Sequence, residues 1–420
     1  MTYTNTIESL KQLVYKWDDI QNICDMIVLW AVLWDSSDIH IEPLSWFVRL
    51  RYRLDGELRE ILEYQSFLHA WVVARFKILS DLKIDESRKP QDGRISRTVE
   101  WKDLDLRVST LPTVHGEKLV MRIVDKSKKI PQLWQLGIEG NNLTLVQKAI
   151  SLPNGVILTC GPTGSGKSTT LYSALTLLNK IDVNIMTLED PVENQVDGIN
   201  QSQVKPDIGY SFAYGLRTAL RQDPDIIMVG EMRDKETVDI AIEASLTGHL
   251  VLSTIHTNNA SETITRVLNM WVQPFLIPAS FNLVLAQRLI KKLCSCKKAY
   301  GLSELGPDKL KDIKNALSIT SKTELNTRLW DILKSPKLYA PVWCEHCENT
   351  GYKGRLWIYE ALEITPGVKK MILAGESAFN INRQAIADGM VSLEQDGIIK
   401  ALQWHTSLEE VYRVAKTQNG

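Results

Sequence analysis

The feature that most constrains this chain is a glycine-rich loop between an apolar run and a helix-forming stretch. Residues 161–168 read GPTGSGKS and fit the pattern G-x-x-x-x-G-K-[ST]. The run GVILTC at 155–160 is typical of a buried strand, and residues 169–180 have the leucine and alanine content of a helix. Small residues in such a loop turn backbone N–H groups toward phosphate oxygens, and the helix start adds its positive dipole end. The segment therefore predicts binding of a nucleoside triphosphate.

The side chains of this loop have separate expected roles. Lys167 is expected to neutralise the charge of the β- and γ-phosphates, and the Ser168 hydroxyl is expected to ligate Mg²⁺. The predicted nucleotide-binding residues are Gly161, Pro162, Thr163, Gly164, Ser165, Gly166, Lys167, Ser168 and Thr169. The alternative, a glycine turn that arises by chance, is disfavoured by the strand and the helix on either side of the loop.

Length, charge and hydropathy narrow the class of protein. At 420 residues the chain exceeds the size at which one hydrophobic core stops growing, so we expect two or three domains. A net charge of −1 offers no argument for bulk nucleic-acid binding. The N-terminus has no signal pattern and no apolar run reaches membrane-spanning length, which predicts a cytoplasmic protein. The longest apolar stretch, Met26 to Trp34, is expected to form a buried core helix.

The patterning along the chain predicts how it is divided. In the first part of the chain, apolar and polar residues alternate and Asp55-Gly56 is a turn signal, which favours an antiparallel-rich α/β domain. A polar linker follows, and beyond it the alternation of strands with helices indicates a parallel sheet. The expected strands are 155–160, 184–189, 225–230 and 249–255, and the expected helices are 168–180, 211–222, 234–247 and 260–270. The predicted segments are an N-terminal helical segment (1–35), the α/β domain (36–125), a linker (126–136), a nucleotide-binding core (137–290), a four-cysteine metal module (291–362) and a C-terminal helical region (363–420).

Hydrolysis also requires acidic groups at the carboxyl ends of the strands beside the phosphate loop. One expected strand is followed by Glu231, and another ends at Glu189 and Asp190. An acid after a strand also occurs as a helix cap, but three of them in one phosphate-loop domain favour a catalytic role. His249 and His256 bracket a further strand, and His256, at its carboxyl end, is the better candidate to sense the terminal phosphate.

These segments, together with others in the same order, resemble the secretion-type ATPases that assemble type IV pili, type II secretion pseudopili and DNA-uptake pili. The matching segments are the phosphate loop, an acidic box (188–193), a second acidic strand (220–234), a histidine box (247–258) and, in the first domain, 37–43, 88–94, 107–113 and 116–118. The resemblance runs from about residue 20 to the C-terminus. It implies an α/β fold in which an N-terminal PAS-like domain is followed by a RecA-like P-loop ATPase domain with a small zinc-binding insertion and C-terminal helices.

The resemblance also implies roles for individual residues. Glu231 matches the carboxylate that activates or positions water, with Glu189 and Glu193 as supporting acids. ATP would sit between the two domains, where arginines of the first domain reach the γ-phosphate on closure. The candidate arginines are Arg94, Arg107 and Arg122, with Arg217 and Arg221 as further candidates.

The activity implied by the resemblance is that of a Mg²⁺-dependent ATPase motor that works as a ring, expected to be a homo-hexamer. It would extend a pilus or pseudopilus through an inner-membrane platform protein, at the inner face of the cytoplasmic membrane. Membrane association would be peripheral and through that partner, without direct nucleic-acid contact. The alternatives are a retraction motor, which lacks the four-cysteine module, a DNA-translocating or conjugation ATPase, for which composition offers no basic pore, and a non-hydrolysing nucleotide-gated scaffold.

Four of the six cysteines form two close pairs, Cys294 with Cys296 and Cys344 with Cys347. Four thiolates suit a closed tetrahedral structural Zn²⁺ site, and the assembly motors of the family are similar in carrying a four-cysteine module there. The first pair has one residue between its cysteines rather than the usual two, which makes His346 an alternative ligand. Paired buried thiols without a metal are the other interpretation.

Overall fold

The computed structural model describes residues 19–320, 324, 328–329 and 336–415. Its contacts divide the chain into two compact units, Met1–Lys129 and Ile130–Gly420. Each unit combines a β-sheet with packed helices, which confirms the predicted α/β class. Residues 1–18 of the predicted N-terminal helical segment lie outside the described residues.

Unit 1 is built on an antiparallel sheet of six strands in the order β3-β2-β1-β6-β5-β4. Its strands are β1 (Asp38–Pro43), β2 (Phe47–Leu54), β3 (Glu57–Gln65), β4 (Gln91–Val99), β5 (Lys102–Thr113) and β6 (Gly116–Asp125), and its helices are α2 (Ile20–Leu33), η1 (Ser66–Leu68) and α3 (His69–Leu79). In β2 every second residue is buried, as expected when one face of a sheet covers a core. Ile23, Ile27 and Ala31 of α2 are buried as well, so the core helix predicted around Met26 to Trp34 is confirmed.

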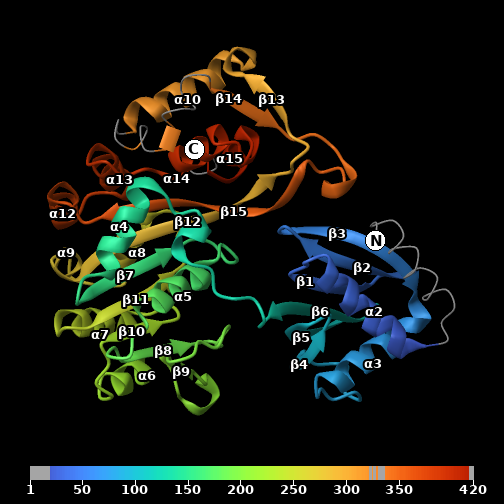
Figure 1. The fold of residues 1–420 in the computed structure, drawn as a ribbon. Helices are drawn as coiled ribbons and strands as arrows, with labels where there is room; N and C mark the ends of the chain where they lie inside the picture. Colours follow the sequence, from blue (N-terminus) through green and yellow to red (C-terminus); the bar gives the residue numbers. More distant parts are fainter. Residues whose placement is uncertain (1–18, 321–323, 325–327, 330–335, 416–420) are drawn as a thin grey trace. The chain divides into compact units, whose positions relative to one another are not determined.

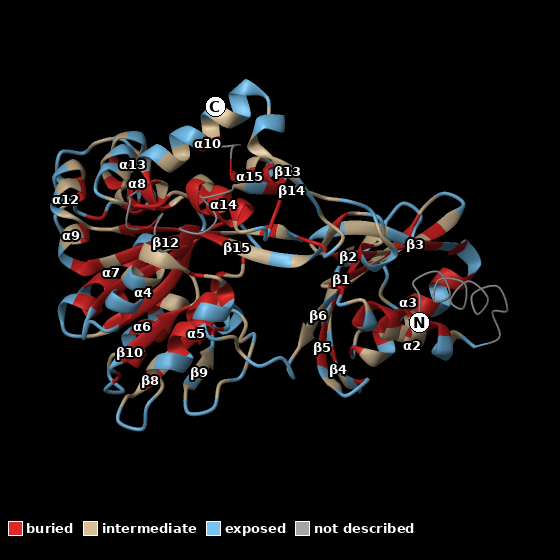
Figure 2. Ribbon diagram, turned by 45° about the horizontal axis from the view of Figure 1, so that its top comes forward, coloured by how far each residue is buried: buried red, intermediate tan, exposed pale blue. Residues whose placement is uncertain are grey.

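Unit 2 contains a sheet of seven strands in the order β15-β12-β7-β11-β10-β8-β9 (Figure 1). All neighbouring strands are parallel except β12 and β15, which pair antiparallel at the edge. The strands are β7 (Gly155–Cys160), β8 (Ile185–Glu189), β9 (Asn200–Gln203), β10 (Ile226–Val229), β11 (Leu250–Ile255), β12 (Phe281–Leu293) and β15 (Tyr352–Glu363). Every residue of β7, β10 and β11 is buried, because helices cover both faces (Figure 2).

Two groups of helices cover this sheet. The helices α4 (Gly140–Ile150) and α5 (Lys167–Leu178) share one hydrophobic core with η2 (Leu133–Leu136). The second hydrophobic core of the unit, on the other side of the sheet, is shared by α6 (Phe212–Ala219), α7 (Lys235–Leu246), α8 (Ala260–Asn269), α9 (Leu276–Ser280), α10 (Pro307–Ile319), α12 (Pro366–Leu373), α13 (Ala378–Ala387), α14 (Leu393–Leu402) and α15 (Leu408–Ala415). The expected elements of the nucleotide-binding core are therefore present, with ends that differ by up to three residues.

The sheet also extends through part of the segment assigned to the metal module. β12 leads directly to Cys294, and β15 begins five residues after Cys347. The short elements of this region are β13 (Lys298–Gly301), η4 (Leu302–Glu304), β14 (Lys337–Ala340) and η6 (Glu345–Cys347), and η3 (Pro206–Ile208) lies between β9 and α6. Among the residues that the structure describes, no helix is long and apolar enough to cross a membrane.

Candidate nucleotide site and cysteine cluster

The glycine-rich loop joins β7 to the first turn of α5. Gly166 is the residue before the helix and adopts a left-handed conformation (φ +85°), which glycine tolerates without steric cost. Lys167 opens the helix and is buried; its Nζ donates to the carbonyl oxygens of Gly161 (2.8 Å) and Pro162 (3.1 Å). The ammonium group therefore lies across the loop that the sequence predicts to hold phosphate, and Ser168 and Thr169 follow it in the helix.

Glu231 lies two residues beyond the end of β10, at the carboxyl edge of the sheet. Its Oε2 is 2.7 Å from Nη2 of Arg233, and its Oε1 is 3.4 Å from Nε2 of His256, which follows β11. The negative charge of Glu231 also acts on Lys167: burial lowers the pKa of the lysine, and the carboxylate opposes that shift. The structure thus places Lys167, Glu231 and His256 at the same edge of the sheet, as the sequence predicts. His249 lies at the other end of β11, where its Nδ1 contacts the carbonyl oxygen of Ala244.

Glu189 has a different environment from Glu231. It is the last residue of β8 and is buried, and its carboxylate accepts hydrogen bonds from the Tyr172 hydroxyl, the Thr187 hydroxyl and Nε2 of Gln201 (3.0 Å). Because Tyr172 belongs to α5, these bonds connect the end of β8 to the helix of the phosphate loop. A supporting role for Glu189 in hydrolysis remains a prediction.

The candidate arginines of unit 1 are engaged within that unit. Nε of Arg94 lies 3.1 Å from Asp105, and Nε of Arg122 lies 3.2 Å from Asp38. Arg107 is half-buried, and its Nε has no hydrogen-bond partner among the described residues. In unit 2, Arg217 pairs with Glu236 and Arg221 contacts the Thr218 hydroxyl. Their action on a γ-phosphate remains a prediction.

The four cysteines of the predicted metal module lie together. Their sulfur atoms all fall within 4.8 Å of one another, and individual Sγ–Sγ distances are 3.8 Å for Cys294 and Cys344, 3.8 Å for Cys296 and Cys347, and 3.5 Å for Cys344 and Cys347. A tetrahedron with Zn–S bonds of about 2.3 Å has edges of about 3.8 Å, so the spacing suits a zinc ion. His346 is exposed and does not belong to this group.

A lysine-bearing loop between a buried parallel strand and a helix, faced by an acid from a neighbouring strand, defines the class of P-loop nucleotide-binding proteins. Within that class the chain belongs to the Type II/IV secretion system protein family, whose model matches residues 16–413. This is the secretion ATPase family that the sequence resembles, so the predicted family is confirmed.

Curated relatives share much of the sequence. The type IV pilus assembly ATPase PilB of Pseudomonas aeruginosa is 46% identical over 393 residues, covering 93% of this chain and 66% of the relative. The type II secretion system protein E of Aeromonas hydrophila is 44% identical over 386 residues, covering 92% of this chain and 74% of the relative. The chain therefore spans about two thirds to three quarters of the length of these relatives.

Solved structures show the same fold at lower sequence identity. The ATPase DotB of Legionella pneumophila matches with a TM-score of 0.65 and 21% identity, covering 93% of this chain and 94% of that one. The pilus retraction motor PilT with bound ADP matches with a TM-score of 0.60 and 23% identity, covering 94% of this chain and 97% of that one.

Sequence reasoning missed the side chains of β12 and β15 that contact the nucleotide site. Gln287 and Trp357 both donate to the carbonyl oxygen of Ser165, and Glu360 accepts a hydrogen bond from the first residue of α8. The available signal was weak: each is a polar or amphipathic residue inside an apolar run, and both runs lie past residue 280, where the strand–helix alternation ends.

Proposed function

We propose that this chain is a cytoplasmic ATPase motor that hydrolyses ATP to drive assembly of a type IV pilus, a DNA-uptake pilus or a type II secretion pseudopilus. The observation that carries the proposal is the position of Lys167 and Glu231 beyond the carboxyl ends of β7 and β10 in one parallel sheet, in a chain whose relatives are named as pilus assembly and type II secretion ATPases. The cysteine cluster favours an extension motor over a retraction motor.

In this proposal the residues of the site divide the work of hydrolysis. Lys167 leaves the loop carbonyls and neutralises the β- and γ-phosphate oxygens, and Ser168 would hold Mg²⁺, which supplies further charge neutralisation when bound. Glu231 orients a water molecule toward the γ-phosphorus and takes up its proton as ADP and phosphate separate. Arg233 and His256 contact different oxygens of Glu231 and so restrict the rotation of its carboxylate.

The ring proposed for this motor, a homo-hexamer, gives the arginines of unit 1 their role. Arg94, Arg107 and Arg122 are the candidates to stabilise the charge that develops on the γ-phosphate. Arg94 and Arg122 each hold an aspartate in the structure, so they would exchange a carboxylate for phosphate oxygens, which an arginine fork binds in a similar bidentate geometry.

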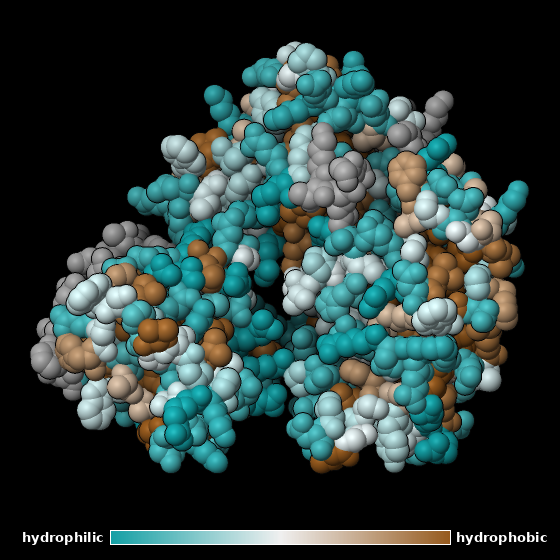
Figure 3. All heavy atoms as spheres, turned by 180° about the vertical axis from the view of Figure 1, so that it is seen from behind, coloured by the Kyte–Doolittle hydropathy of each residue, from teal (hydrophilic) through white to brown (hydrophobic). Residues whose placement is uncertain are grey.

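The proposed docking partner is an inner-membrane platform protein, which would hold the motor at the inner face of the membrane. Large hydrophobic side chains on unit 2 support contacts with other proteins: Trp271, Phe275 and Phe379 are 80%, 61% and 69% exposed. Hydrophobic areas also interrupt the hydrophilic surface of this unit in Figure 3. Exposed aromatic side chains of this kind are typical of protein interfaces.

We propose that the cysteine cluster holds one structural Zn²⁺ ion through Cys294, Cys296, Cys344 and Cys347. The hydrogen bond from the backbone N–H of Gly351 to Sγ of Cys347 (3.2 Å) supports this, because such donors stabilise a ligating thiolate. The ion would tie the end of β12 to the start of β15.

The proposed activity is tested by separating nucleotide binding from turnover. We expect Glu231→Gln to bind ATP as wild type does while its kcat falls about 100-fold or more, because the amide cannot take up the proton of the attacking water. Lys167→Ala should instead weaken ATP binding. Glu243→Gln, which changes an exposed acid on α7, serves as the control and should behave as wild type. Wild-type turnover in the Glu231→Gln variant would contradict the role of this acid, and a wild-type chain that neither binds nor hydrolyses ATP would refute the proposal.

A further inference from the structure

The phosphate loop is held from one side by two strands that sequence reasoning did not connect to it. The carbonyl oxygen of Ser165 accepts hydrogen bonds from Nε2 of Gln287 on β12 (2.7 Å) and from Nε1 of Trp357 on β15 (2.9 Å). The fit is close: a Cβ atom on Gly166 would lie 2.5 Å from Nε1 of Trp357, and one on Gly161 would lie 2.4 Å from the carbonyl oxygen of Gln287. The loop is therefore fitted against β12 and β15.

These two hydrogen bonds determine which way a phosphate-binding group points. In a trans peptide the carbonyl of one residue and the N–H of the next point in opposite directions. Anchoring the Ser165 carbonyl toward β12 and β15 therefore turns the N–H of Gly166 away from these strands. Loops of this type bind phosphate through such N–H groups, so the anchored carbonyl keeps one donor oriented before nucleotide arrives.

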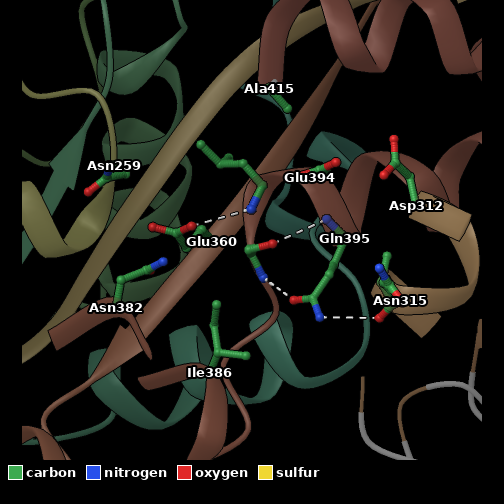
Figure 4. A pocket seen from close by; sticks show the side chains of 12 residues that line it. Asn259, Asp312, Asn315, Glu360, Asn382, Ile386, Glu394, Gln395 and Ala415 are labelled. Carbon is green, nitrogen blue, oxygen red and sulfur yellow. Dashed lines mark hydrogen bonds between the residues drawn. The ribbon is translucent and has the colours of Figure 1, made fainter. Parts of the chain in front are cut away.

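The opposite face of β15 contacts the segment that carries His256. Glu360 is buried, its Oε1 accepts a hydrogen bond from the N–H of Ala260 (2.9 Å), and its Oε2 accepts one from the N–H of Leu393 (3.3 Å; Figure 4). Burial raises the pKa of Glu360, while the two backbone donors favour its charged form. Ala260 follows the histidine loop (residues 256–259) directly, so Glu360 fixes the end of that loop at the start of α8.

We propose that β12 and β15 position both loops of the nucleotide site, with Gln287 and Trp357 acting through the phosphate loop and Glu360 acting through the histidine loop. None of the three contacts nucleotide in this scheme, so they are positioning residues. The inference rests on the proposed hydrolysis of ATP. It predicts that a change at Trp357 alters the Kd for ADP and a change at Glu360 alters kcat, because the two side chains lie on opposite faces of β15. A general loosening of the sheet would change both quantities together.

The first arm of the test concerns binding. Trp357→Phe keeps an aromatic ring and removes the N–H donor, and Gln287→Leu replaces the amide with an apolar side chain that is one bond shorter. A hydrogen bond contributes about 0.5–1.5 kcal/mol, so each variant should weaken ADP binding by about two- to tenfold. The double variant should weaken it by more than the product of the two, because the buried carbonyl then loses both donors. The value of kcat should change by less than twofold.

The second arm concerns turnover. Glu360→Gln presents one N–H₂ group to a backbone N–H and should displace the histidine loop, so kcat should fall about tenfold or more while the Kd for ADP stays within twofold of wild type. The matched controls are Trp343→Phe, at a tryptophan that is 77% exposed, and Glu363→Gln, at the half-buried end of β15, where the carboxylate pairs with Lys148 and contacts neither loop. Circular dichroism and melting temperature establish that each variant is folded.

The outcomes distinguish this inference from the proposed function. A wild-type chain without ATP binding would refute the proposed function itself. If wild type is active and Trp357→Phe, Gln287→Leu and Glu360→Gln match their controls, β12 and β15 do not position the loops. The inference is also overturned if all three folded variants change Kd and kcat in the same proportion, since that is the behaviour of a purely structural role.

Discussion

A buried cluster of charges beneath β15 gives the sharpest prediction about stability. Oδ1 of Asp396 lies 2.7 Å from Nη1 of Arg328, and Oδ2 accepts hydrogen bonds from Nζ of Lys400 (2.8 Å) and the N–H of Tyr359 (2.8 Å). The side chains of Asp396, Arg328 and Lys400 are each 2% exposed. Burial alone would raise the pKa of Asp396, but the two cations outweigh it and hold the pKa below its usual value. The carboxylate is therefore ionised at neutral pH.

Replacing Asp396 by asparagine should destabilise unit 2 by about 3–5 kcal/mol, the range found when one partner of a buried ion pair is removed. If the amide oxygen serves Lys400 and Tyr359, the amide N–H₂ group faces the guanidinium of Arg328, and two donors oppose each other. Lys400 also loses the carboxylate that balances its charge, and among the described residues the carbonyl oxygen of Trp357 (2.6 Å) is then the remaining hydrogen-bond acceptor of its Nζ. At about 2 °C per kcal/mol for a unit of this size, the melting temperature should fall by about 6–10 °C.

The assay is thermal unfolding followed by circular dichroism at pH 7, with Asp239→Asn as the control because Asp239 forms an exposed i,i+4 pair with Lys235. The control should change stability by less than about 0.5 kcal/mol. The double variant Asp396→Asn/Lys400→Met should recover part of the loss, since it also removes the unbalanced charge. A shift below about 2 °C for Asp396→Asn, or a double variant less stable than the single, would refute the reasoning.

Three further predictions follow from the same structure. The difference in the free energy of unfolding between wild type and Asp396→Asn should be full at pH 7 and should shrink as the pH falls below 3.8. The pKa of Asp396 is lowered in the folded protein, so its ionised carboxylate stabilises the fold above the pKa of the unfolded chain, and that stabilisation is lost when the carboxylate is protonated. Unfolding in urea across this pH range measures the difference. Protein purified without added metal should contain about one zinc per chain by elemental analysis, and Cys296→Ser should lower that content; zinc-free folded protein would exclude the site. If the proposed motor is a ring, adding Lys167→Ala chains to wild type should reduce ATPase activity by more than the fraction of variant chains added. A strictly proportional loss of activity, together with a monomeric mass by light scattering, would contradict the ring.

Local sequence patterns predicted the nucleotide-binding core because its signals are short-range. The fully buried strands read as unbroken apolar runs, and the loop from Gly161 to Gly166 has a spacing that few other structures require. The position of Glu231 beside the phosphate loop also followed from sequence, because the carboxyl ends of parallel strands meet at one edge of a sheet.

What sequence could not predict depends on contacts between distant residues. Trp357 and Ser165 are separated by 192 positions, and Arg328 and Asp396 by 68, so no local pattern records either pairing. Arg49, Arg51 and Arg53 of β2 pair with Glu42 and Asp38 on the neighbouring strand β1. Antiparallel register decides such pairings, and the sequence of one strand does not contain it.

The charge cluster and the candidate nucleotide site both contact β15. Lys400 binds the carbonyl of Trp357 and Asp396 binds the N–H of Tyr359, so the cluster fixes the backbone on both sides of Ile358. The indole of the same Trp357 holds the phosphate loop. Apolar side chains in place of the cluster could pack as well, but they could not hydrogen-bond to the backbone of β15. We therefore attribute the presence of the ion pairs to the positioning of this strand, and not to a gain in the free energy of unfolding. Asp396→Asn should therefore weaken ADP binding as well as lower the melting temperature, whereas an apolar substitution elsewhere in the core that costs as much stability should leave ADP affinity unchanged.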